Sequence, residues 1–372
     1  MKLAIICTHP IQYYIPVFKI LAQKTELKVF YTAGKNTHFD KGFNQGVNWD
    51  IPLFDGYLFE FLLNTAKEQG SHHFMGIKNP DAIKHITNFG PDYLLVYGWA
   101  YFSHLNILRH FKGKTPILFR GDSTLLNKKS IFKSFLKGVI LKYVYCHIDK
   151  AFYVGTNNKA YFKKYGLKEE QLKFAPHAVD NERFIRKSTS DIRSQLHIQK
   201  HETLILFAGK FESIKDPELL LKAFIALNLL NVHLLYVGSG VLETELKSKA
   251  NGYCNIHFMP FQNQSAMPAV YQACDLFCLP SKNDSWGLVV NEAMAAGKAI
   301  IVSDKTGAAI DLVRPLNGRI FQSGNLKDLK SKLSELVSNR EQLHLKGQHS
   351  EEIISSWNFE NQVKNILNAI AN

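Results

Sequence analysis

The sequence predicts an α/β protein with two doubly wound domains, in which helices cover both faces of a parallel sheet. Three observations support this prediction. The chain has 372 residues, a length near that of two or three ordinary domains. Hydrophobic residues make up 46% of it and charged residues 21%, which is enough apolar material for large cores. Short apolar runs alternate with longer segments of helical period, a pattern typical of strand–helix units with parallel strands.

Five apolar runs in the first half are predicted to be strands, and three periodic segments between them are predicted to be helices. The strands are Leu3–Cys7, Leu27–Tyr31, Tyr93–Tyr97, Ile117–Arg120 and Ala151–Val154, and the helices are Pro16–Gln23, Ala82–Asn88 and Ile131–Tyr145. The first run is too short for a secretion signal, and no segment approaches the roughly 18–20 apolar residues of a membrane span. We therefore expect it to be the first buried strand.

The second half repeats the same alternation. Its predicted strands are Leu204–Ala208, Leu234–Val237, Ile256–Met259, Leu276–Leu279 and Ile300–Ser303. The run Asp216-Pro217-Glu218 predicts a helix start, with a cap residue, a proline at the first helical position and an acid in the first turn. The polar stretch between residues 184 and 200 lacks apolar periodicity, so we place the domain boundary there. This gives domains over 1–185 and 186–356, followed by an amphipathic helix within 357–372.

Positive charge is concentrated in the first half of the chain. Residues 1–186 hold 26 Lys and Arg against 14 Asp and Glu, a net of +12, out of a total of +13. This distribution fits either a basic soluble surface or contact with an anionic partner, namely lipid headgroups, a phosphorylated acceptor or nucleic acid. The five cysteines are scattered and form no C-x-x-C pair, which argues against a disulfide framework or a zinc site and fits a reducing cytoplasm.

The segment from Pro280 to Gly297 carries the clearest functional signal. It follows a predicted strand, and in a parallel sheet ligands bind beyond the carboxyl ends of the strands. A helix that starts near Gly287 presents free backbone N–H groups, which favour a phosphate. Asp284 precedes this helix and Glu292 lies about two turns inside it. One carboxylate is placed to contact a sugar, and the other to accept hydrogen bonds from a ribose.

This segment resembles the signature of the family 4 retaining glycosyltransferases, also described as glycosyl transferases group 1. That signature has two acids separated by seven residues, before a Glu-Ala-Met-Ala-x-Gly run, and here Asp284 stands where Glu is usual. The resemblance implies the GT-B fold, in which two Rossmann-like domains face a central cleft. It further implies an acceptor-side first domain, a donor-binding second domain and a C-terminal helix that packs back toward the first domain.

The resemblance also assigns donor-binding residues along the second half. A glycine loop and a downstream lysine are expected to clamp the donor diphosphate, although Lys210 stands where the family usually has arginine, which alone makes a bidentate contact. A second glycine turn and an aromatic residue are expected to border the nucleotide. The expected donor-binding residues are Gly209, Lys210, Lys215, Gly238, Phe261, Asp284, Ser285, Trp286, Gly287, Leu288 and Glu292.

On the acceptor side the match is looser. His9 lies in the first strand–helix loop, and Arg120 and Asp122 follow a strand where members often carry a catalytic histidine. Together with Asp284, these three are the candidate catalytic residues. An Arg–Asp pair that only orders a loop is an equal alternative. His72-His73 has no acid that we recognise at ligand spacing, and we interpret it as a surface loop.

The resemblance implies a retaining, hexosyltransferase-type enzyme that uses a nucleotide-diphosphate sugar, with UDP expected rather than GDP. No metal or other cofactor is expected, because D-x-D is missing. The implied acceptor is a glycan or a lipid-linked glycan of bacterial cell-surface polysaccharide synthesis. Two alternatives stay open: a nucleotide-sugar epimerase or phosphorylase of the same fold, and a basic nucleic-acid-binding protein. The second is disfavoured because no recognition motif for nucleic acid accompanies the charge.

Residues 128–150 predict contact with an anionic membrane. They hold six lysines and a single acid, Asp149, and the apolar residues beside the lysines form a stripe: Phe132, Phe135, Leu136, Val139 and Tyr143. A basic amphipathic helix of this type binds anionic headgroups. The alternative is a helix that packs on the sheet through this stripe, with its lysines in water. We expect a cytoplasmic protein, peripheral on the inner face of the membrane and held through Lys129, Lys133 and Lys137 rather than by insertion.

Overall fold

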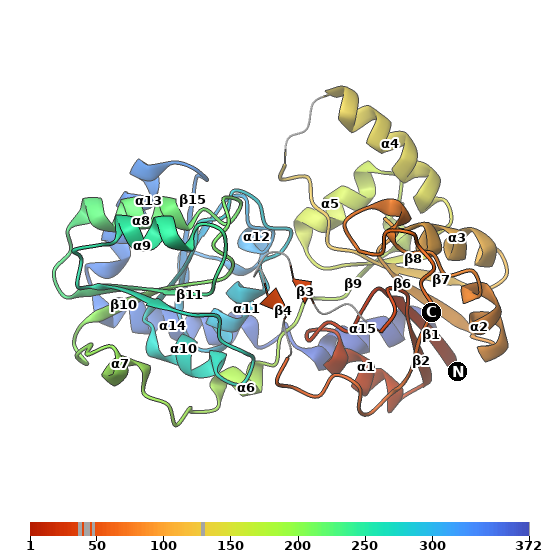
Figure 1. Cartoon of the computed structure of the whole chain (residues 1–372), viewed down its shortest axis with the longest axis horizontal. Coiled ribbons are helices and arrows are strands. Elements are labelled where there is room, and N and C mark those ends of the chain that lie inside the picture. The colour runs from red at the N-terminus through yellow and green to blue at the C-terminus, as the bar shows by residue number, and fades with distance from the viewer. Residues whose placement is uncertain (36–38, 41–44, 47–48, 128–130, 372) are drawn as a thin grey trace. The chain divides into compact units, whose positions relative to one another are not determined.

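A computed structural model describes residues 1–35, 39–40, 45–46, 49–127 and 131–371 (Figure 1). Its contacts divide the chain into two compact units. Unit 1 comprises Met1–His38, Pro52–Pro176 and Phe359–Asn372, and unit 2 comprises Phe39–Ile51 and His177–Asn358. The segment over 177–185, which the sequence analysis placed in the first domain, lies in unit 2 because its helix contacts two helices there.

Unit 1 contains a seven-stranded parallel sheet in the order β5-β2-β1-β6-β7-β8-β9. Its strands are β1 (Lys2–Cys7), β2 (Glu26–Tyr31), β5 (Leu58–Phe61), β6 (Tyr93–Tyr97), β7 (Ile117–Arg120), β8 (Lys150–Tyr153) and β9 (Leu172–Phe174). Its helices are α1 (Ile15–Ala22), α2 (Ala82–Phe89), α3 (Phe102–Phe111), α4 (Ile131–Tyr145), α5 (Thr156–Lys164) and α15 (Phe359–Ala371), with short 3₁₀ turns η1 (Phe74–Gly76) and η2 (Glu169–Gln171).

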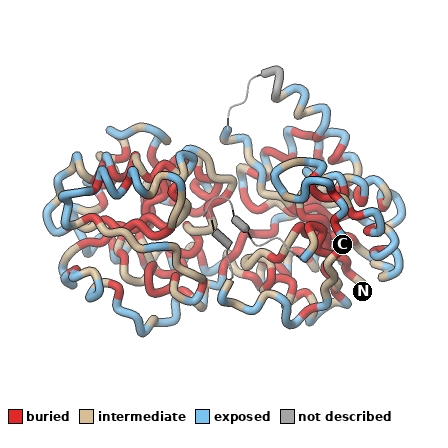
Figure 2. The backbone as a smooth tube through the Cα atoms, viewed as in Figure 1, coloured by how far each residue is buried: buried red, intermediate tan, exposed pale blue. Residues whose placement is uncertain are grey.

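The core of unit 1 lies between the sheet and its helices (Figure 2). Alternate residues of the central strands, such as Ala4 and Ile6, pack against α2, α3, α4 and α5 on one face. On the other face α1 packs against α15. The C-terminal helix is tied to the sheet edge by Lys150 Nζ, which donates to the Ala369 carbonyl at 2.6 Å, and by Tyr93 Oη, which donates to the Ile370 carbonyl at 3.1 Å.

Unit 2 contains a six-stranded parallel sheet in the order β12-β11-β10-β13-β14-β15. Its strands are β10 (Thr203–Ala208), β11 (Val232–Val237), β12 (Ile256–Met259), β13 (Leu276–Leu279), β14 (Ala299–Ser303) and β15 (Gly318–Phe321), with a short antiparallel pair, β3 (Phe39–Asp40) and β4 (Gln45–Gly46). Its helices are α6 (Asn181–Ile185), α7 (Ile192–Gln195), α8 (Pro217–Leu227), α9 (Glu243–Lys249), α10 (Met267–Ala273), α11 (Leu288–Ala295), α12 (Ala309–Leu312), α13 (Leu326–Val337) and α14 (Arg340–Ile354).

A second core fills the space between the unit 2 sheet and helices α8, α9 and α13, while α10, α11 and α14 lie on the opposite side (Figure 1). The prediction of two doubly wound parallel sheets and a C-terminal helix is therefore confirmed. The central strands lie within one or two residues of their predicted bounds. Edge strands β5, β9 and β15 were not predicted, because their residues are only partly buried and carry no continuous apolar run.

Two local expectations have clear outcomes. Asp216 precedes α8 as predicted, but its side chain does not cap the helix and instead pairs with Lys282 at 3.0 Å. All five cysteines are free thiols, in agreement with the expected absence of a disulfide framework. Across the described ranges, no helix combines the length and the apolar character needed to cross a bilayer.

Candidate functional site

The strand order of unit 2 reverses between β10 and β13. After β10 the chain adds β11 and β12 on one side, then returns to add β13, β14 and β15 on the other. Open α/β sheets bind ligands beyond the carboxyl ends of the strands at such a reversal, so the loops that follow β10 and β13 form the candidate site. These are the loops that hold Lys210 and Lys215 on one side and Asp284 to Gly287 on the other.

An ion pair joins these two loops. Lys215 Nζ lies 2.6 Å from Asp284 Oδ2, and the two side chains are 25% and 10% exposed. The Asp284 backbone is fixed on both sides, because its N–H donates to the Lys305 carbonyl and its own carbonyl accepts from the Gly307 N–H. The pair therefore places one ammonium and one carboxylate at the carboxyl end of the sheet in a defined geometry.

The glycines after β10 and β11 allow two backbones to pack directly together. A Cβ atom on Gly238 would lie 2.0 Å from the Gly209 carbonyl oxygen, and Gly238 has a φ of +142°. Beside them Phe211 N–H donates to the Ser239 carbonyl at 2.9 Å. This packing explains the Gly-Ser-Gly sequence without a dinucleotide, and it fixes the backbone of the loop that carries Lys210.

The start of α11 offers the anion-binding end that the sequence predicts. The helix begins at Leu288 after Gly287, whose φ is +91° and whose Cβ would lie 2.9 Å from Thr306 Cγ2. Its N-cap residue is Gly287, which has no side chain to cap the helix. Backbone N–H groups in the first turn of a helix, together with the helix dipole, favour a phosphate. Thr306 and Gly307, which the sequence analysis missed, close this corner, because a Cβ on Gly307 would overlap the Ser285 carbonyl.

Two of the expected donor residues are largely interior. Trp286 is 2% exposed, its ring stacks on Trp357 at a centroid distance of 5.2 Å, and its Nε1–H donates to Asn291 Oδ1 at 3.0 Å. Its backbone N–H lies 3.4 Å from Asp284 Oδ1. Glu292 is also 2% exposed, and its Oε2 accepts from the Tyr271 hydroxyl at 2.8 Å. Trp286 is therefore packed in the interior next to the start of α11, against Trp357 and Asn291. Glu292 is buried on the same helix.

Phe261 lies after β12, next to a residue from a distant part of the sequence. The Trp49 ring is 6.2 Å from the Phe261 ring, centroid to centroid, in an edge-on arrangement. The Asp50 carboxylate accepts from the Ser265 N–H at 3.1 Å, and the Asp50 N–H donates to Asn263. Trp49 thus joins the aromatic surface expected to border the nucleotide base. It was missed because nothing in its local sequence links it to the second domain.

In unit 1 the strand order reverses between β1 and β6, which is the equivalent position for a ligand. His9 follows β1, and its Nδ1 is 2.9 Å from Thr8 Oγ1. Burial raises the pKa of the Tyr14 hydroxyl, and the negative charge of Asp122 raises it further. Tyr97 ends β6, and its buried hydroxyl has no hydrogen-bond partner among the residues that the structure describes. Tyr97 is a polar group at this reversal that sequence reasoning missed.

Arg120 has a different environment from its neighbour Asp122. It is 2% exposed, and its guanidinium donates to the carbonyls of Ala175 and Pro176 at 2.9 and 3.1 Å. These contacts hold the segment that follows β9. The geometry favours the alternative in which Arg120 orders a loop.

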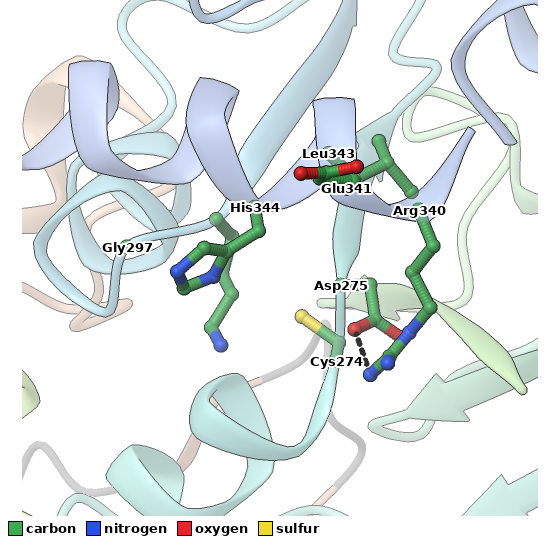
Figure 3. Close-up of a pocket in the computed structure, with 8 residues that line it drawn as sticks. Cys274, Asp275, Gly297, Arg340, Glu341, Leu343 and His344 are labelled. Carbon is green, nitrogen blue, oxygen red and sulfur yellow. Dashed lines mark hydrogen bonds and ion pairs between the residues drawn. The ribbon is translucent and has the colours of Figure 1, made fainter. Parts of the chain in front are cut away.

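A cavity of about 310 Å³ lies elsewhere in unit 2 (Figure 3). It is lined by Cys274, Asp275, Gly297, Lys298, Arg340, Glu341, Leu343 and His344. Asp275 and Lys298 precede β13 and β14, so the cavity lies at the amino ends of these strands, the edge opposite the Asp284 loop. Asp275 is already neutralised by Arg193 and Arg340, which lie 3.1 and 2.9 Å from it. The cavity therefore contains none of the predicted site residues.

The structure corrects one interpretation in unit 1. His72-His73 does have an acid beside it. Glu68 lies four residues before His72, and its Oε1 is 3.0 Å from His72 Nε2. In the described part of the chain, these three residues are the only group of histidines, cysteines and acids close enough to share a metal ion. Their exposure is high, and the imidazole–carboxylate contact accounts for the arrangement.

Known proteins resemble this chain in sequence and in fold. Residues 188–352 match the family model described as glycosyl transferases group 1. D-inositol 3-phosphate glycosyltransferase of Nocardia farcinica is 26% identical over 197 residues, which cover 49% of this chain and 43% of that protein. Its counterpart in Rhodococcus jostii is 27% identical over 188 residues, which cover 47% and 42%. The chain thus spans less than half the length of the curated relatives it matches.

Solved structures match over the whole chain. A crystal structure of Anabaena HepE in complex with UDP has a TM-score of 0.77 at 16% identity, with 100% of each chain covered. Sucrose-phosphate synthase from Thermosynechococcus elongatus has a TM-score of 0.77 at 15% identity, covering 100% of this chain and 98% of that one. These likenesses confirm the expected GT-B fold.

Proposed function

We propose that this protein is a retaining glycosyltransferase of family 4 that transfers a sugar from a nucleotide-diphosphate sugar, with UDP as the nucleotide. The observation that carries this proposal is the Lys215–Asp284 ion pair, which joins the loops that follow β10 and β13 beside the N-terminal end of α11. The matched family model covers this region, and HepE has been crystallised with UDP and with UDP-glucose.

In the proposed mechanism the donor diphosphate lies near Lys210, Lys215 and the N–H groups of α11. Negative charge develops on the diphosphate as the bond to the sugar breaks. Fixed cations and N–H groups aimed at that charge stabilise the transition state more than the bound donor. We propose that these groups act on the diphosphate without a metal ion. Asp284 contacts the sugar, and Glu292 accepts hydrogen bonds from the ribose.

The acceptor is proposed to be a glycan or a lipid-linked glycan of bacterial cell-surface polysaccharide synthesis. Its hydroxyl would be bound by unit 1, at the carboxyl ends of β1, β6 and β7, where His9, Tyr97 and Asp122 lie. A lipid-linked acceptor requires a cytoplasmic enzyme that works at the inner face of the membrane. The excess of positive charge in the first half of the chain supports this location.

The test is incubation with labelled UDP- and GDP-sugars and with lipid extracts as acceptors. Transfer of label to a glycolipid, with retained anomeric configuration by NMR, is the expected result. An isomerised donor or phosphate-dependent cleavage would identify an epimerase or a phosphorylase instead. A thermal-shift panel of nucleotides selects the donor first, since a ligand at 100 times its Kd adds about 2.7 kcal/mol to stability.

A further inference from the structure

Helix α4 (Ile131–Tyr145) exposes a broad apolar face. Five large hydrophobic side chains along one side are 44–70% exposed: Phe135, Leu136, Val139, Ile140 and Tyr143. The helix packs on unit 1 through other residues, since Leu141, Val144 and Tyr145 are buried in the core. Four members of the stripe predicted from the sequence, Phe135, Leu136, Val139 and Tyr143, are therefore exposed and do not pack on the sheet, and the Phe132 side chain lies outside the described residues. Exposed apolar patches of this kind mark interaction sites.

Helical geometry separates the two faces cleanly. At 3.6 residues per turn, the five exposed residues cover an arc of about 140°, and the three buried residues lie on the opposite side. Phe135 and Ile140 lie at the two ends of this arc, and Val139, Tyr143 and Leu136 lie between them. An amphipathic helix with this arrangement has a second apolar face that its own domain leaves uncovered.

Lysines border the exposed arc. Lys142 follows on one edge, beside Gly166, and Lys137 lies beyond the other edge, where its ammonium is over the ring of Tyr161 at 4.6 Å. The helix contains no acid, and Asp149 beyond it is paired with Lys112 at 2.7 Å. Lysines at the margin of an apolar face can keep their ammonium groups at headgroup level while the apolar side chains enter the acyl region.

We propose that this face of α4 inserts into the interfacial region of an anionic bilayer, with Phe135, Leu136, Val139, Ile140 and Tyr143 among the acyl chains. This proposal extends the membrane location given above, and it revises the contact expected from the sequence. Lys137 turns back onto Tyr161, and Lys129 and the Lys133 side chain lie outside the described residues. The absence of acids on α4 and the net positive charge of the first half select an anionic bilayer as the occupant.

Vesicle binding of the full chain tests the proposal, with vesicles of phosphatidylcholine alone or with 30% phosphatidylglycerol. No sugar nucleotide or acceptor is added, so the result is independent of the proposed enzyme activity. The matched variants are Leu136→Glu on α4 and Leu63→Glu. Leu63 is an exposed leucine elsewhere in unit 1 (74% exposed), so both variants add the same negative charge at the surface. We expect Leu136→Glu to weaken partitioning into anionic vesicles about tenfold, and Leu63→Glu to leave it within about twofold.

A second measurement distinguishes insertion from electrostatic attachment. In Leu136→Trp, brominated acyl chains should quench the new fluorescence, and quenching should persist at high salt, where lysine–headgroup attraction is screened. Leu63→Trp should remain unquenched. Absence of vesicle binding, equal loss in both Glu variants, or binding that disappears entirely at high salt would overturn the proposal. It would also be overturned by a lipid-free dimer that sedimentation shows to dissociate in Leu136→Glu, since a second copy would then cover this face.

Discussion

Replacing Lys215 with methionine should slow sugar transfer more than it weakens donor binding. In the structure the ammonium lies 2.6 Å from the Asp284 carboxylate and is 25% exposed, so it is held in place before any donor arrives. A charge-assisted hydrogen bond of this kind contributes about 1.5–3 kcal/mol, which corresponds to roughly 13- to 160-fold in kcat if it acts mainly on the leaving diphosphate. Methionine has a similar length without the charge, so packing changes little.

The assay compares kcat at saturating donor with the donor Kd from calorimetry. Lys215→Met should lower kcat by one to two orders of magnitude and change Kd by less than about tenfold. Lys210→Arg is the matched control, because it keeps the positive charge, and it should retain activity. An unchanged kcat in a folded Lys215→Met variant would refute the assigned role. A Kd effect as large as the kcat effect would show uniform binding instead of transition-state stabilisation.

Three further changes probe the site and its support. Glu292→Ala should lower donor affinity by about 1.5–3 kcal/mol, and it should also reduce stability because the buried Tyr271 hydroxyl loses the Glu292 carboxylate as acceptor. Glu292→Gln should restore most of the stability but not the donor affinity. Calorimetry measures the affinity, and urea unfolding measures the stability. Gly238→Ala should destabilise unit 2 by about 1–3 kcal/mol, because its Cβ meets the Gly209 carbonyl at 2.0 Å, and wild-type urea midpoints in this variant would contradict that packing. Burial lowers the pKa of His104 from 6.5 to about 4, so as pH falls this histidine takes up a proton in the unfolded chain before it does so in the folded protein. The free energy of unfolding should therefore drop by about 2 kcal/mol between pH 7 and pH 5. If the free energy of unfolding falls just as steeply with pH in His104→Asn, this residue is not the cause.

The fold was predictable because its central strands are fully buried. β7, β10, β13 and β14 are buried at every position and carry apolar runs, and their bounds lie within one residue of those runs. The edge strand β5 is half-covered and mixed in composition, so a local pattern does not identify it.

The site was predictable where it is carried by one continuous segment. Asp284, Gly287 and Glu292 are within a single loop and helix, so their spacing alone places them together. Thr306 and Trp49 reach the same region only through tertiary contacts, and no spacing in the sequence signals them. The sequence likewise did not decide whether the apolar face of α4 is exposed, because an amphipathic pattern does not indicate which of the apolar residues pack in the core.

Hydrogen–deuterium exchange of the full chain with and without saturating UDP tests the location of the donor site most directly. We expect UDP to slow exchange in three segments of unit 2: residues 209–215, 238–242 and 284–292. Exchange around Arg340 and His344, at the cavity on the opposite edge of the sheet, should not change. Protection confined to that cavity, or no protection at UDP concentrations far above those that bind related enzymes, would show that the donor does not bind at these segments.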